Sequence, residues 1–124
     1  MDLTPIVPAG RQIIERYGPA GFRVSGVVYR SSVLVLPDRT LEWPAASALA
    51  VSIETLAPVF AHGEVEILIL GLGKSGGLLG RELRARLKEI GIAFEAMDTG
   101  AACRTYTVLS SEDRPVAAAL IRPL

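Results

Sequence analysis

The apolar positions of this chain change their spacing along its length, and the spacing predicts which segments are strands and which are helices. Residues 22–25 alternate apolar with polar side chains, which is typical of a half-buried strand. Residues 65–70 form an apolar-rich run that leads directly into a glycine-rich loop at 71–77. Beyond that loop, apolar residues recur at the spacing of one helical face: Leu79, Leu83, Leu87 and Ile90. The segment 66–90 therefore predicts a strand, a loop and a helix, as in a small α/β domain.

The first third of the chain predicts a meander of short strands joined by turns. The candidate strands are residues 11–17, 22–25, 27–29, 33–36 and 41–43. Gly26 interrupts the pattern between the second and third of them. We expect a bulge or bend at Gly26, because glycine tolerates the backbone dihedral angles that a bulge requires. Pro37 and Asp38 suit a turn, since proline presets its first central dihedral angle.

A helix is predicted in the region 52–62, with Ser52 as its N-terminal cap and Gly63 as its end. Pro58 complicates this prediction, because a proline inside a helix loses a backbone hydrogen bond and clashes with the preceding turn. Either the helix starts late, near Glu54, or it is kinked at the proline.

The next elements predict a βαβ crossover. The helix at 79–90 ends at Gly91, and strand 93–97 follows it. Strands 66–70 and 94–97 should then be parallel, with a right-handed connection. Because parallel strands end at the same edge of a sheet, the loop 71–77 and the segment 98–104 should lie together there.

The end of the chain predicts one more helix and one more strand. Asp98 and Thr99 begin a helix, whose apolar positions are Ala102, Tyr106 and Leu109. Residues 116–121 are apolar on both faces, and a strand of that kind belongs in the middle of a covered sheet.

Composition limits the architecture and the kinds of partner. With 124 residues, the chain is expected to form one domain, 1–124, and half of its residues are apolar. This apolar content predicts a surface patch that mediates self-association or contact with a protein partner. Thirteen basic residues balance thirteen acidic ones, so no nucleic-acid partner is expected. We also expect no transmembrane segment, no secretory signal and no cofactor, and a cytoplasmic location.

Two blocks of the sequence resemble a known family. They are residues 66–73 and the specific block 97–106, Met-Asp-Thr-Gly-Ala-Ala-Cys-Arg-Thr-Tyr, with support from 17–26, Trp43 and 114–120. The chain resembles the domain-of-unknown-function family that contains the mitochondrial respiratory complex I assembly factor and an adipogenesis-associated cytosolic protein. The likeness extends over nearly the whole chain.

This resemblance implies a three-layer α/β fold with a mixed central sheet and a small N-terminal β layer. It also implies that most members have no established activity and that the mitochondrial relatives act with protein partners. The chain begins without a targeting peptide, so it looks like a bacterial member. Its loop departs from the family pattern at Leu72, where a small hydroxyl residue is common, and at Lys74-Ser75.

The glycine loop is the candidate anion site. Residues 71–76 satisfy the dinucleotide fingerprint, although a flexible connection between strand and helix explains the same glycines. A phosphate-loop motif is excluded, because position 68 is leucine where that motif needs glycine. We predict a weak phosphate-type site formed by main-chain amides of the loop and two cations, comprising Gly73, Lys74, Ser75, Gly76, Gly77 and Arg104.

Other candidates at the same edge are Asp98, Thr99 and Cys103, and none is assigned a catalytic role. Asp98 and Thr99 are most simply helix-capping residues, and Arg104 either binds an anion or pairs with a carboxylate such as Asp98. Cys103 is either a thiolate nucleophile or a small buried side chain.

The single histidine argues against a catalytic pair. His62 should lie at the opposite, amino edge of the sheet as a C-terminal helix cap, away from Cys103. No cluster of cysteine and histidine predicts a metal site. Trp43 is either a core residue or an interface anchor.

The sequence leads to three hypotheses of function. The first is a non-enzymatic domain that supports assembly or regulation through protein contacts, with a respiratory or membrane complex as one setting. The second is a small-anion or nucleotide-binding protein that uses loop 71–77 with Arg104. The third is a cysteine-dependent enzyme.

Overall fold

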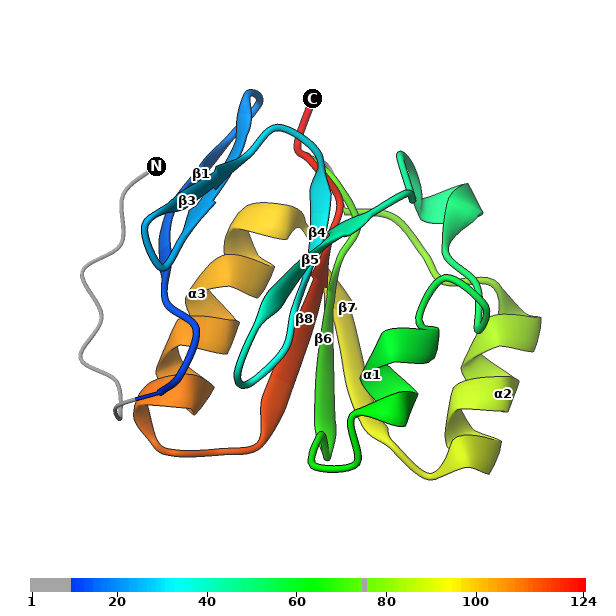
Figure 1. Cartoon of the computed structure of the whole chain (residues 1–124). Helices are drawn as coiled ribbons and strands as arrows, with labels where there is room; N and C mark the ends of the chain where they lie inside the picture. The colour runs from blue at the N-terminus through cyan, green and yellow to red at the C-terminus, as the bar shows by residue number, and fades with distance from the viewer. Residues whose placement is uncertain (1–9, 75) are drawn as a thin grey trace.

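The computed structural model describes residues 10–74 and 76–124, which form two sheets covered by helices (Figure 1). The smaller sheet has the strand order β1-β2-β3, with β1 Ile14–Gly18, β2 Gly21–Val24 and β3 Val27–Tyr29. The larger sheet has the order β5-β4-β8-β6-β7, with β4 Ser32–Val35, β5 Thr40–Trp43, β6 Ile67–Gly71, β7 Ala93–Met97 and β8 Val116–Leu120. The helices are α1 Ala57–Ala61, α2 Arg81–Ile90, α3 Thr99–Ser111 and the short 3-10 turn η1 Ala48–Ala50.

The central sheet is mixed, as the resemblance implied. Strand β6 is parallel to both β7 and β8, whereas β4 is antiparallel to β5 and β8. The predicted parallel pairing of 66–70 with 94–97 is therefore confirmed. Strand β8 is the middle strand and all five of its residues are buried, which confirms the prediction from its two-sided apolar pattern.

Two apolar cores lie on the two faces of the central sheet. The small sheet and α3 cover one face, and α1, α2 and η1 cover the other (Figure 1). Alternate residues of β8 divide between the cores: Ala117 and Ala119 belong to the core under α1 and α2, whereas Ala118 belongs to the core under α3 and the small sheet. The three-layer arrangement with a small N-terminal β layer is thus confirmed.

The meander prediction is wrong in one respect, because the five early strands divide between the two sheets. Strand β4 pairs with β8, so β4 and β5 belong to the central sheet. Gly26 makes a tight hairpin turn instead of a bulge. Ser25 and Gly26 have φ angles of 45° and 83°, and two successive positive values suit a two-residue hairpin. The register irregularity lies instead in β1, between Ile14 and Arg16.

The first helix is much shorter than the predicted 52–62. Ser52 and Thr55 close a local turn in which the Thr55 amide donates to Ser52 Oγ at 3.1 Å. Helix α1 begins only at Ala57, which places Pro58 in its first turn. There the missing amide hydrogen of proline costs no helical hydrogen bond, so no kink is needed. The helix starts even later than the predicted Glu54, and the predicted cap at Ser52 is wrong, because the N-cap position is Leu56.

Two further boundaries differ from the sequence prediction. Helix α2 begins at Arg81 and ends as expected at Gly91, whose φ angle is 87°. Ile90 was predicted on the apolar face but is 46% exposed, whereas Leu87 on that face is buried. Trp43 belongs to the core: it is 2% exposed and its indole Nε1 donates to the carbonyl of Thr55 at 2.9 Å.

In the described ranges, no helix combines the length and apolar character needed to span a bilayer.

We expect Gly71→Ala to destabilise the protein by about 1–3 kcal/mol, because the added methyl group overpacks a closed contact. A Cβ atom at Gly71 would lie 3.0 Å from Leu120 Cδ2 and 3.0 Å from Thr99 Cα. Urea unfolding measures the effect. The matched control is Gly18→Ala, where nothing lies within 4 Å of the new Cβ. Equal unfolding midpoints for the two variants would contradict this view of the packing.

Candidate functional site

The carboxyl edge of the central sheet is organised by one buried hydroxyl group. Thr99 is 0% exposed, and its Oγ1 donates to the carbonyl of Ile121 at 2.6 Å. The same oxygen accepts from the amide of Gly73 at 2.9 Å, and the amide of Thr99 donates back to the Gly73 carbonyl at 2.9 Å. Thr99 therefore fastens the glycine loop, the start of α3 and the end of β8 to one another.

Asp98 is the N-terminal cap of α3, as the sequence predicted. Its Oδ1 accepts a hydrogen bond from the amide of Ala101 at 2.9 Å. The capping role predicted for Thr99 is wrong, because its hydroxyl is engaged by Gly73 and Ile121. No local pattern of residues indicates this contact, since the carbonyl of Ile121 comes close only in the folded sheet.

The glycine loop lies against the start of α3, and α2 begins well beyond it. A Cβ atom at Gly76 would lie 3.5 Å from the amide nitrogen of Asp98. Residues 78–80 separate the loop from α2, which starts at Arg81. The dinucleotide interpretation of 71–76 is therefore wrong, because that fingerprint requires the loop to open the following helix.

The candidate loop residues differ in whether their amide or side-chain groups are available to bind a ligand. The amide of Gly73 is bonded to Thr99, and the amide of Gly76 donates to the Gly73 carbonyl at 3.4 Å. Gly73, Gly76 and Gly77 all have positive φ angles, a backbone conformation that favours glycine. Lys74 is exposed, and Ser75 lies outside the described residues.

Arg104 has a partner that sequence reasoning missed. Its Nη1 donates to Tyr17 Oη at 2.8 Å, so it reaches from α3 to the small N-terminal sheet. A Cβ atom at Gly100 would lie 3.1 Å from Tyr17 Oη and 3.4 Å from Arg104 Nη1. The guanidinium group thus lies over the first turn of α3. The only early signal was that Tyr17 and Arg104 both belong to the blocks that carry the family resemblance.

Cys103 is a small buried side chain, and the nucleophile hypothesis is wrong. It is 0% exposed on the face of α3 that packs against the central sheet. Burial raises the pKa of its thiol to about 12, despite the opposing effect of the neighbouring Arg104 charge. A thiol with that pKa stays protonated near neutral pH, and only the thiolate is an effective nucleophile.

His62 lies at the C-terminal end of α1, before β6, as predicted for the amino edge. Its Nε2 is 2.7 Å from Asp38 Oδ1, and this hydrogen bond lowers the pKa of the Asp38 carboxyl. Within 10–74 and 76–124, no group of three or more histidine, cysteine or acidic side chains is arranged to hold a metal ion.

We expect stability to fall as the pH rises above about 9. The pKa of Cys103 is raised from 9.0 to about 12, and burial also raises that of Tyr106 from 10.0 to about 12. The unfolded chain therefore ionises first, so stability is complete below pH 9 and is lost as the pH rises towards 12. Each pH unit over which a group is ionised only when unfolded costs about 1.4 kcal/mol.

Urea unfolding at pH 8, 9, 10 and 11 checks this dependence. Cys103→Ala should make the fall between pH 9 and 11 shallower, because the variant has no thiol to ionise. Thr107→Val on the same helix is the control and should keep the slope of the original protein. A Cys103→Ala slope equal to that of the control would contradict the assignment.

The anion site at the glycine loop stays a prediction, and a phosphate titration followed by NMR tests it. We expect millimolar binding, roughly −4 kcal/mol, with shifts of the amides of Gly76 and Gly77. Arg104→Ala should weaken these shifts, whereas Tyr17→Phe, which removes only the partner hydroxyl of Arg104, should preserve them. No shift in the loop, or the same shift in Arg104→Ala, would rule out a shared site.

Comparison with known proteins gives a consistent family assignment. A family model described as "Protein of unknown function (DUF498/DUF598)" matches residues 14–121. The chain is 39% identical over 112 residues to NADH dehydrogenase (ubiquinone) 1 alpha subcomplex assembly factor 3 of Danio rerio, covering 90% of this chain and 64% of that protein. It is 36% identical over 113 residues to an uncharacterized protein of Rhodobacter capsulatus, covering 91% and 86%.

Solved structures agree with this assignment. The crystal structure of an outer membrane protein from Bartonella henselae matches with a TM-score of 0.84 and 34% identity, covering 96% of this chain and 100% of that one. The solution structure of a Mth938-like domain from Bordetella pertussis matches with a TM-score of 0.79 and 26% identity, covering 98% and 92%. The resemblance found in the two sequence blocks is therefore confirmed, and the chain belongs to the DUF498/DUF598 family of proteins of unknown function.

Proposed function

We propose that this protein is a non-enzymatic factor that acts through protein contacts in the assembly or regulation of a membrane-bound respiratory NADH dehydrogenase. The observation that carries the proposal is its 39% identity over 112 residues to a complex I assembly factor. The chain spans 64% of that relative's length, and the match contains 90% of the chain.

The chemistry of the carboxyl edge supports binding in preference to catalysis. Asp98 caps α3, Thr99 fastens the glycine loop, and Cys103 is buried as a neutral thiol. Each of these side chains stabilises the fold through the contacts described above. A catalytic acid or base needs a side chain that reaches a substrate proton. These three side chains face the protein itself.

Two exposed leucines support a protein-contact surface near the same edge. Leu49 is 98% exposed and Leu78 is 87% exposed. Their segments contact each other, since a Cβ atom at Gly77 would lie 3.7 Å from Ala48 Cβ. When a partner covers such exposed apolar side chains, the complex is stabilised by about 25 cal/mol per Å² of apolar surface removed from water.

We expect deletion of the gene to lower the amount of assembled respiratory NADH dehydrogenase in its own organism, measured on native gels by in-gel activity. The intact gene should restore the complex. Leu49→Ser combined with Leu78→Ser should fail to restore it, because the double variant loses its apolar contact while keeping the core intact.

Val108→Ser is the matched control, because Val108 is 55% exposed on α3, far along the chain from both leucines. It should restore the complex as well as the intact gene does. The folding of each variant is checked by its thermal midpoint. Normal levels of the complex in the deletion strain would contradict the proposed function, whereas full rescue by the double variant would contradict only the role of the leucines.

A further inference from the structure

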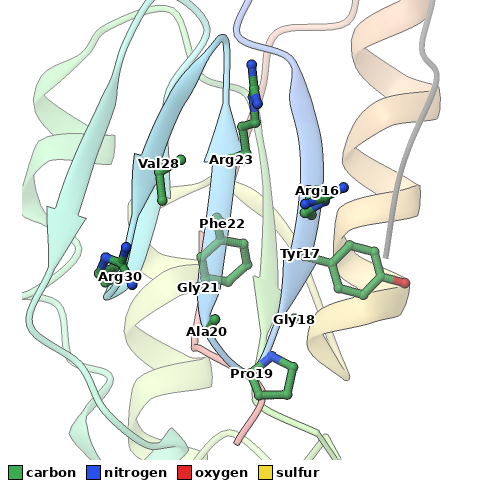
Figure 2. A pocket seen from close by; sticks show the side chains of 10 residues that line it. All are labelled: Arg16, Tyr17, Gly18, Pro19, Ala20, Gly21, Phe22, Arg23, Val28 and Arg30. Atoms are coloured by element: carbon green, nitrogen blue, oxygen red, sulfur yellow. The ribbon is translucent and has the colours of Figure 1, made fainter.

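The outer face of the small N-terminal sheet has a different character from the rest of the fold. Its inner face is apolar, with Phe22 and Val24 buried in the core. On the outer face, Arg16 of β1 lies opposite Arg23 of β2, which in turn lies opposite Val28 of β3. Figure 2 shows these side chains on the three strands.

A hollow of about 380 Å³ lies on this face. Near the turn Gly18 lies opposite Gly21, and neither residue carries a side chain that would fill the hollow (Figure 2). Gly21 accepts no larger residue, because a Cβ atom there would lie 2.0 Å from the carbonyl oxygen of Tyr29. The turn at 19–20 closes one end, and Arg30 stands on the β3 side. The volume is in the range of natural binding pockets, roughly 300–1,000 Å³.

The segment that forms this face is basic. Between residues 14 and 30 the sequence has three arginines and one acid, Glu15, in a chain whose net charge is zero. Arg16 lies directly opposite Arg23 on the neighbouring strand. Glu15 pairs with Arg23, with its Oε1 3.3 Å from Arg23 Nε. The same carboxylate oxygen also accepts from the amide of Gly26 at 2.6 Å.

The spacing of the arginines favours an extended segment over a single small ion. Arg23 and Arg30 are diagonal neighbours, because Arg23 lies opposite Val28. Diagonal neighbours on adjacent strands are about 7–8 Å apart. Alternate side chains of an extended chain are about 6.7 Å apart and point the same way. An extended segment with several acidic residues can therefore reach both Arg23 and Arg30.

Exposure gives a second reason. The side chain of Arg23 is 53% exposed, and an ion pair in such a setting is worth only about 0–1 kcal/mol by itself. Useful affinity on this face then requires several contacts at once, which a segment lying across the sheet makes and a lone anion does not. Val28, which is 60% exposed, and the turn at 19–20 add apolar contact area beside the arginines.

We propose that this outer face binds an acidic, extended segment of a partner protein, with its carboxylates against Arg23 and Arg30 and its backbone over the Gly18–Gly21 pair. The inference rests on the proposed function only in assigning the ligand to a protein partner. The guanidinium groups hold carboxylate oxygens in two-point contacts, which lysine does not reproduce.

The test is an NMR titration of the full chain, labelled with ¹⁵N, with a synthetic peptide of alternating glutamate and serine. Amides of residues 16–30 should shift, and the shifts should weaken as salt is raised. A peptide of alternating glutamine and serine should leave them unchanged. Arg30→Ala should weaken binding of the acidic peptide by about three- to fivefold, the loss of one exposed ion pair.

Two variants separate charge from shape. Gly18→Ala adds a methyl group at the hollow without a clash, because nothing lies within 4 Å of a Cβ atom at Gly18, and it should weaken binding with all charges retained. Arg86→Ala removes one exposed arginine from α2 and should bind as the original protein does. Thermal midpoints confirm that each variant is folded.

Four results would overturn the proposal. Three are equal binding of the glutamine peptide, equal losses in Arg30→Ala and Arg86→Ala, and shifts outside the small sheet. Inorganic pyrophosphate that reproduces the shifts at similar concentration would also overturn it, by showing a small-anion site. The titration contains no native partner, so a negative titration contradicts this binding site without contradicting the proposed function. A negative gene-deletion experiment contradicts the proposed function, and the titration still tests the binding site.

Discussion

The fold depends on a central strand that is buried on both sides. Every residue of β8 is covered, and its middle three residues are alanines. Small side chains allow a layer to approach each face closely, with α3 and the small sheet on one side and α1 and α2 on the other. Close approach leaves no room for a side chain at Gly71, which faces Leu120 and Thr99. The same closeness brings the Thr99 hydroxyl within reach of the Ile121 carbonyl.

The carboxyl edge follows from this packing. In open α/β sheets that edge often holds a ligand, because loops leave the strands there and helices begin there. Here the hydrogen-bonding groups at the edge are largely used by the protein. The Thr99 hydroxyl accepts a hydrogen bond from the Gly73 amide, and the Asp98 carboxylate accepts one from the Ala101 amide. The Arg104 guanidinium donates a hydrogen bond to the Tyr17 hydroxyl. The edge thereby joins the N-terminal sheet to α3 and to the glycine loop.

Sequence periodicity correctly predicted where a strand lies when the burial of its two faces determines its position. It failed where the pairing depends on a segment far away in the chain. The two-sided apolar pattern of β8 was sufficient to place it in the middle of the sheet. The division of the early strands between two sheets was not predictable, because pairing of β4 with β8 joins residues far apart in the chain. At the site, the Asp98 cap is a local interaction and was predicted. The Tyr17–Arg104 and Thr99–Ile121 hydrogen bonds are not local, and spacing gives no sign of them.

The two surfaces left for partners belong to opposite layers of the molecule. Ala48, beside the exposed Leu49, packs against the core under α1 and α2, whereas the arginine face belongs to the sheet that packs with α3. One surface is apolar and the other is basic, so they select partners by different interactions. Burial drives contact at the leucines, and charge sets specificity at the arginines. Because the buried β8 strand lies between these layers, a segment bound to the small sheet leaves the leucines accessible to a second protein. This separation is compatible with the assembly role proposed above, in which one partner is held while another is added.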